Sequence, residues 1–211
     1  MGEKRLSDPF PGSKEVDVAP SEDKLRKAGF TQTRRLLDEA DIARALRRIA
    51  DEIVERNAGT DDLVLVGIRT RGVFLAERIR KNIQQTEGRE PPHGILDITL
   101  YRDDVLTGLP DPEIKPTSLE IPLRDQNVVL VDDVLYTGRT IRAALDAIMD
   151  FGRPRCIQLA VLVDRGNREL PIQADYVGLR IDTDKKHDAV AVMVTEKDSG
   201  PDRAVLYRRA E

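Results

Sequence analysis

The chain has 211 residues, of which 40% are hydrophobic and 34% are charged, and its formal net charge at pH 7 is −4. These values fit a soluble globular domain with a sizeable core, and they exclude a disordered chain or a globally basic nucleic-acid binder. A single cysteine, Cys156, excludes an internal disulfide. Without a membrane-length apolar stretch or a signal segment, we expect a cytoplasmic protein.

The first 33 residues are polar and contain several prolines, glycines and serines, without a sustained hydrophobic period. Such a composition predicts a disordered or loosely attached tail. The folded domain is therefore expected to span residues 34–211.

The first strong periodicity follows Asp38 and predicts a helix that ends near Asn57 and Gly59. Its apolar face consists of Ile42, Ala45, Leu46, Ile49 and Ile53. The opposite face carries three arginines that are candidates for nucleic-acid contact, namely Arg44, Arg47 and Arg48. The alternative is a solvated face on which these arginines pair with neighbouring acidic residues.

A strand at Leu63–Ile68 is followed by a turn with two arginines and a glycine, and then by a helix over Val73–Gln85. Two guanidinium groups beside free helix amides would suit a diphosphate, which needs several charged donors. The alternative is that the arginines only cap the junction between strand and helix.

A further strand is predicted at Gly94–Leu100, and a long irregular stretch over Tyr101–Thr117 comes after it. A loop of this length in a compact domain is usually a lid or a disordered excursion. Leu119–Pro122 is interpreted as the strand that returns from it.

Asn127–Phe151 predicts a buried strand, two adjacent carboxylates (Asp132 and Asp133), a small-residue turn and a helix. A helix N-terminus attracts an anion such as phosphate, and neighbouring carboxylates are costly unless a ligand or cation accompanies them. A ribose 5-phosphate would satisfy both halves. The alternative is a capped strand–helix junction without a ligand.

The remaining predicted strands are Ile157–Val163, Ala174–Ile181, Ala189–Thr195 and Ala204–Tyr207. Strands that alternate with helices favour an α/β fold with a doubly wound, mainly parallel sheet, flanking helices and a flexible lid loop.

Several segments resemble the type I phosphoribosyltransferase family. VVLVDDVLYTGRT is similar to that family's signature for phosphoribosyl pyrophosphate (PRPP), and GIRTRGVFLAERI is similar to a pyrophosphate loop of the family. LDITLYRDD, GRPRCIQLAVLVDRG and RELPIQADYVG resemble the PyrR branch of pyrimidine operon regulators. The resemblance covers about Asp38 to Gly178, and the five segments together are specific.

The resemblance implies two activities. One is uracil phosphoribosyltransferase activity, in which uracil and PRPP give UMP and pyrophosphate with Mg²⁺ bound to PRPP. The other is UMP-dependent binding to pyrimidine leader RNA, which attenuates transcription. The alternatives are a transferase or UMP sensor that has lost RNA binding, and an orotate or purine-salvage enzyme. The family also implies a homo-oligomer, at least a dimer, and no metal site made by the protein alone.

The motif matches imply a role for each candidate residue. The 5-phosphate would lie on Thr137, Gly138, Arg139 and Thr140, and the ribose on Asp132 and Asp133. Pyrophosphate would lie on Thr70, Arg71 and Gly72, with Arg102 closing from the lid. Uracil would lie near Val163, Asp164 and Arg165.

The RNA-binding motif departs from the family pattern. Arg168 is retained, but Asn167 stands for a histidine, Gln173 for an arginine and Leu179-Arg180 for Lys-Asn. Each lost cation removes about one phosphate contact. Beside Arg168, the cations that could compensate are Arg34, Arg35, Arg44, Arg47 and Arg48. The alternative is that the RNA-binding role has been lost.

Overall fold

The computed structural model describes residues 21–101, 117–119 and 121–209. Arg102, most of the predicted lid and the first 20 residues of the predicted tail lie outside these ranges.

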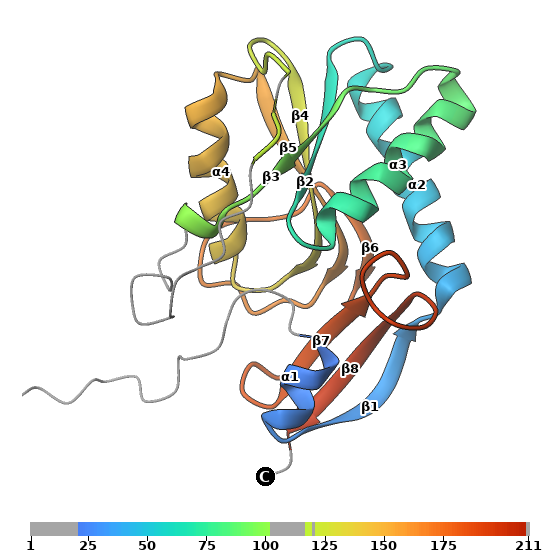
Figure 1. Ribbon diagram of the computed structural model, residues 1–211, viewed down its shortest axis with the longest axis vertical. Helices are drawn as coiled ribbons and strands as arrows, with labels where there is room; N and C mark the ends of the chain where they lie inside the picture. The colour runs from blue at the N-terminus through green and yellow to red at the C-terminus, as the bar shows by residue number, and fades with distance from the viewer. Residues whose placement is uncertain (1–20, 102–116, 120, 210–211) are drawn as a thin grey trace, which may run out of the picture.

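The centre of the molecule is a five-stranded sheet with the order β3-β2-β4-β5-β6, in which all neighbouring pairs are parallel. Its strands are β2 (Leu63–Ile68), β3 (His93–Leu96), β4 (Asn127–Leu135), β5 (Cys156–Asp164) and β6 (Tyr176–Arg180). The order places β2, β4 and β5 side by side (Figure 1).

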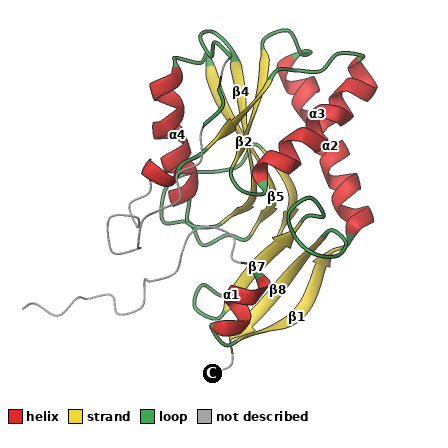
Figure 2. Ribbon diagram, viewed as in Figure 1, coloured by secondary structure: helices red, strands yellow, loops and turns green. Residues whose placement is uncertain are grey.

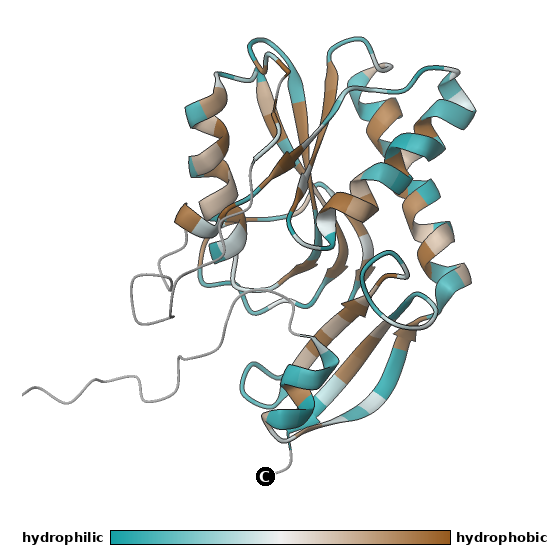
Figure 3. Ribbon diagram, viewed as in Figure 1, coloured by the Kyte–Doolittle hydropathy of each residue, from teal (hydrophilic) through white to brown (hydrophobic). Residues whose placement is uncertain are grey.

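Helices cover both faces of this sheet (Figure 2). α2 (Glu39–Asn57) and α3 (Gly72–Glu87) pack on one face, and α4 (Arg139–Phe151) packs on the other. Side chains alternate along β2, so that Leu63 and Leu65 join the α2–α3 core while Val64 and Val66 join the α4 core. Apolar residues therefore run continuously along the strands, as Figure 3 shows, and the prediction of a doubly wound α/β fold is confirmed.

A second, smaller sheet has the order β1-β8-β7 and is antiparallel throughout. Its strands are β1 (Phe30–Leu37), β7 (Asp188–Met193) and β8 (Arg203–Arg209). One face joins the main core through Val190 and Val192. The short helix α1 (Glu22–Lys27) covers the other face (Figure 1).

Residues 22–33, which precede the predicted start of the domain at residue 34, thus belong to the fold. Leu25 and Phe30 are buried against the small sheet, and Glu22 accepts hydrogen bonds from Tyr207 and Arg203. α1 is only six residues long, too short to show a hydrophobic period, and its partners lie almost at the other end of the chain. This explains why the sequence placed residues 22–33 in the tail.

Two further boundaries differ from the prediction. The strand expected at Gly94–Leu100 ends at Leu96, and a 3₁₀ turn, η1 (Thr99–Tyr101), follows it. The Asp97 side chain accepts hydrogen bonds from both the backbone N–H and the hydroxyl of Thr99, which favours a turn over an extended strand. In place of the strand expected at Leu119–Pro122, the described residues show a single bridge between Ile95 and Ser118.

The first turn of α3 lies directly against β2 and β4. A Cβ on Gly67 would lie 2.5 Å from Val73 Cα, and a Cβ on Gly72 would press on the Val131 carbonyl oxygen and lie 3.2 Å from Asp132 Cα. Only glycine permits this backbone approach, because the neighbouring atoms belong to main chain that cannot rotate away.

Gly72→Ala is therefore expected to lower the free energy of unfolding by about 1–3 kcal/mol, the usual cost of overpacking a core. The control is Gln84→Ala, which changes an exposed position on the same helix and should stay within about 0.5 kcal/mol. Chemical denaturation measures both values, and equal stabilities would contradict the close packing of α3 on β4.

Candidate active site

The carboxyl ends of β2, β4 and β5 carry the loops in which the sequence placed the candidate residues. β2 pairs with β4, and β4 pairs with β5, all in the same direction. The loops that follow these strands therefore meet at one edge of the sheet, where ligands of open α/β sheets usually bind.

Asp132 and Asp133 occupy the end of β4, and each is only 5% exposed. Alternation along the strand places Asp133 on the side of α3 and Asp132 on the side of α4. The Asp133 backbone N–H donates to Asp132 Oδ1 over 2.9 Å, and the Val134 N–H donates to Asp133 Oδ1 over 3.0 Å. Burial raises the pKa of the Asp133 carboxyl, while the positive charge of Arg71 opposes this rise.

The loop before α4 has the geometry expected for binding a phosphate. Gly138 adopts a φ of 96°, in the left-handed region that favours glycine, and so turns the chain into the helix. The Arg139 backbone N–H donates to Thr137 Oγ1 over 3.3 Å, and Thr140 follows in the first turn of α4. Amides of a first helical turn lack partners within the helix, and here they combine with the hydroxyls of Thr137 and Thr140.

Arg71 lies in the loop predicted for pyrophosphate, but its guanidinium group is engaged within the protein. Its side chain is 8% exposed, and it donates from Nε and Nη2 to the two oxygens of Asp198 over 2.9 and 2.8 Å. Thr70 is exposed beside it, after a cis peptide bond from Arg69. Of the three residues predicted for pyrophosphate, Thr70 is thus the exposed one, while Arg71 and Gly72 are buried.

The end of β5 holds the three residues predicted for uracil. Val163 is fully buried, and Asp164 accepts hydrogen bonds from the Gly166 N–H and from Arg168. Arg165 is also buried, and its guanidinium carbon lies 4.0 Å from the ring centre of Tyr136.

Arg165 is further held by Thr183 Oγ1 and by the Asp188 carbonyl. An arginine on an aromatic ring is a stable stacking pair. This pair could not be predicted from the sequence, because Tyr136 and Arg165 belong to different strand–loop units.

Arg168, which the sequence analysis proposed for RNA, makes its contacts inside the molecule. Its guanidinium donates to the carbonyls of Tyr136 over 2.7 Å, Gly166 over 3.0 Å and Ile172 over 3.0 Å, and to the Asp164 carboxylate over 2.6 Å. Most N–H donors of the Arg168 guanidinium thus form hydrogen bonds that hold the loop after β5 against the loop before α4.

The other RNA candidates lie on α2 and differ in how they are engaged. Arg44 pairs with Asp41, while Arg48 pairs with Glu52 and also donates to the carbonyls of Val177 and Gly178. Arg47 is exposed, and it forms no ion pair with any part of the chain that the structure describes.

Asn167, the residue at the family's histidine position, has a φ of 59° and donates to the Thr183 carbonyl over 2.8 Å. Asparagine adopts this left-handed conformation more readily than most residues. The substitution therefore suits the local backbone of the loop.

Within the described ranges, no cluster of three or more His, Cys, Asp or Glu side chains is arranged to hold a metal ion. Mg²⁺ usually binds through one or two carboxylates together with substrate phosphates and water, which the pair Asp132 and Asp133 fits. None of the helices in residues 21–101, 117–119 and 121–209 is long and apolar enough to cross a membrane.

Comparison with known proteins agrees with this geometry. A family model described as phosphoribosyl transferase domain matches residues 32–197, so α1 precedes the matched region. The bifunctional protein PyrR of Pelotomaculum thermopropionicum is 57% identical over 176 residues, which cover 83% of this chain and 96% of that protein. The bifunctional protein PyrR of Deinococcus radiodurans is 55% identical over 172 residues, which cover 82% and 93% of the two chains.

Solved structures show the same fold at lower identity. The hypoxanthine phosphoribosyltransferase of Trypanosoma cruzi has a TM-score of 0.64 at 16% identity, over 85% of this chain and 98% of that one. The family match over most of the length, together with relatives more than half identical, shows that the chain belongs to the phosphoribosyltransferase family and, within it, to the PyrR proteins.

Proposed function

We propose that the chain transfers ribose 5-phosphate from PRPP to uracil, giving UMP and pyrophosphate, and that it binds pyrimidine leader RNA in response to UMP. The observation that carries the proposal is the buried carboxylate pair Asp132 and Asp133, directly before a glycine-containing helix N-terminus. A ribose 5-phosphate has hydroxyls for the carboxylates and a phosphate for the helix. Membership in the PyrR proteins supports uracil as the acceptor.

In this reaction the bond between ribose C1 and pyrophosphate breaks, a bond from uracil N1 to C1 forms, and the N1 proton passes to solvent. Positive charge develops at C1 as pyrophosphate departs. Two buried carboxylates accept from the ribose hydroxyls and stabilise that charge, because a water-poor site strengthens electrostatic interactions. The amides and hydroxyls of Thr137–Thr140 hold the 5-phosphate, while Thr70 and the first amides of α3 receive pyrophosphate.

Mg²⁺ would enter the site with PRPP. Its chemistry is to neutralise the phosphate oxygens of the departing pyrophosphate. Asp132 and Asp133 are the side chains that could share it, since Mg²⁺ prefers oxygen ligands and keeps several of its waters. Arg102, in the lid, is proposed to close over the same group.

Uracil is proposed to lie at the end of β5, beside the Tyr136–Arg165 stack. The loop there is held firmly by Arg168, so the backbone groups of residues 163–165 can present a fixed edge to the base. Purine-salvage members of the family usually carry an acidic residue at the position of Tyr136, which counts against a purine acceptor.

RNA binding is proposed for the exposed side of α2, where Arg47 offers an uncommitted charge among the described residues. An arginine binds phosphate through the N–H donors of its guanidinium, and those of Arg168 already bind backbone carbonyls of the protein. The protein is proposed to act in the cytoplasm as a homo-oligomer, in keeping with its substrates and its family.

The transferase proposal is tested by Asp133→Asn in an assay of pyrophosphate release from PRPP with uracil, orotate, hypoxanthine or guanine. We expect turnover with uracil alone, and a loss of at least about 100-fold in kcat for the variant, as for removal of one preorganised electrostatic group. The control is Asp146→Asn on the exposed side of α4, which should keep full activity. Turnover with another base but none with uracil would overturn the proposal.

Asp133→Asn is also expected to change the pH dependence of stability. Burial raises the pKa of Asp133 in the folded chain above its unfolded value, so this group's contribution favours folding at low pH and is lost as pH rises through the folded pKa. Asparagine removes the ionisation, and the melting temperature at neutral pH should therefore equal or exceed that of the wild type. A clear fall in melting temperature would show that the Asp133 charge stabilises the fold.

Substitutions at Arg47 and Arg168 are predicted to affect RNA binding and uracil turnover differently. In gel shifts with a pyrimidine leader RNA and UMP, Arg47→Ala should reduce the salt dependence by about one counterion and leave uracil turnover unchanged. Arg168→Ala should lower uracil turnover, because it releases the loop after β5. Failure of the wild type to bind the RNA at low salt would refute the RNA-binding role.

A further inference from the structure

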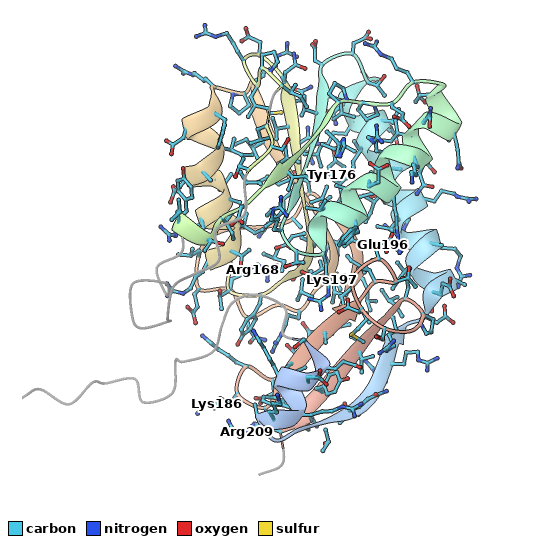
Figure 4. All side chains as sticks on the ribbon, viewed as in Figure 1. Arg168, Tyr176, Lys186, Glu196, Lys197 and Arg209 are labelled. Atoms are coloured by element: carbon cyan, nitrogen blue, oxygen red, sulfur yellow. The ribbon has the colours of Figure 1, made fainter. Side chains whose placement is uncertain are left out.

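Two arginines, one just before α3 and one on it, contact the loop that joins β7 to β8. Arg71, just before α3, binds Asp198, and Arg78, two turns later, binds Glu196 and Asp202. In Figure 4, Glu196 marks this loop beside the N-terminal half of α3. The small antiparallel sheet is thus fastened to the helix that carries the pyrophosphate loop at its start.

The Asp198 carboxylate that pairs with Arg71 is also fixed by hydrogen bonds within its own loop. Asp198 Oδ2 also accepts from the Val194 N–H over 3.0 Å, and the Asp198 backbone N–H donates to the Val194 carbonyl over 2.7 Å. These bonds fix the carboxylate before it meets the arginine. Burial would raise the pKa of Asp198, but the hydrogen bonds from Arg71 and Val194 hold it below its ordinary value.

Arg71 also lies within electrostatic reach of Asp133, the buried carboxylate proposed to act on the ribose. A guanidinium that binds Asp198 through two parallel hydrogen bonds has little freedom to turn. Because Arg71 belongs to the backbone from Thr70 to Gly72, its fixed side chain restrains where that backbone can lie. Asp198, in the loop between two strands of the second sheet, is thus tied to a loop at the edge of the first.

We propose that Asp198 is a positioning residue of the transfer reaction: through Arg71 it holds the loop that receives pyrophosphate beside Asp133. The inference rests on the proposed function. Asp198 does not touch the substrate, and the Arg71 side chain serves as its anchor rather than as a pyrophosphate ligand. The loop after β7 is then a support for the site, although it lies far from the motifs in the sequence.

The matched control is the second ion pair of the same loop. Glu196 binds Arg78 through two hydrogen bonds, with the same chemistry, the same helix and the same loop, but two turns away from Thr70. Its side chain is 37% exposed, against 18% for Asp198. If the loop only joined the small sheet to α3, Asp198→Asn and Glu196→Gln could differ in melting temperature but not in PRPP affinity.

The test measures the affinities of PRPP with Mg²⁺ and of UMP by calorimetry, on the full chain and on both variants. UMP contains the ribose and the 5-phosphate but no pyrophosphate. Asp198→Asn is therefore expected to weaken PRPP binding by about 10-fold, as for loss of a charged hydrogen-bonded pair, and to leave UMP binding within about 2-fold. Glu196→Gln should change neither affinity.

Unchanged PRPP affinity in Asp198→Asn, or an equal loss for PRPP and UMP, would overturn the proposal. Asp198→Glu keeps the charge on a longer arm, so it answers the same question if the asparagine variant fails to fold. It should fold and still lose PRPP affinity selectively. A wild-type chain that binds UMP but not PRPP would instead refute the proposed transferase, which keeps the two failures distinguishable.

Discussion

The burial of Asp133 at the end of β4 is the constraint on which the rest of the site depends. A carboxylate removed from water is costly unless charges and hydrogen bonds surround it, and the Val134 N–H and the charge of Arg71 offset part of that cost. The close approach of α3, which Gly72 permits, brings Arg71 to this place. Charge and packing therefore act together at one strand end.

The small antiparallel sheet is linked to the candidate site through the loop between β7 and β8. It pairs the beginning of the folded chain with its end, since β1 lies beside β8, and its loop between β7 and β8 reaches α3. An unsupported loop before α3 would pay a large entropy cost on binding pyrophosphate. A loop already held by Asp198 and Arg71 avoids much of that cost, which is the general advantage of a preorganised site.

The segment between β5 and β6 joins the two proposed activities. Residues at its start lie at the proposed uracil site, and Arg168 and Asn167 stand at positions that the family resemblance connects with RNA. In the folded chain Arg168 binds the Tyr136 carbonyl and the Asp164 carboxylate, and Asn167 binds the Thr183 carbonyl. These contacts support the proposal that the segment is a rigid wall of the nucleotide site, and α2 offers the more accessible charge.

The two strand–loop–helix units around Leu63–Gln85 and Asn127–Phe151 could be predicted from the sequence alone. Their patterns are local: apolar runs, a helical period and the glycines and acids between them. The sequence also identified the family. The contacts between distant parts of the chain became known only from the folded structure: Arg71 with Asp198, Arg165 with Tyr136, and α1 with the small sheet. The sequence does not show whether a charged or aromatic side chain contacts a ligand or a distant residue, because its neighbours in space are set by the folding of the whole chain.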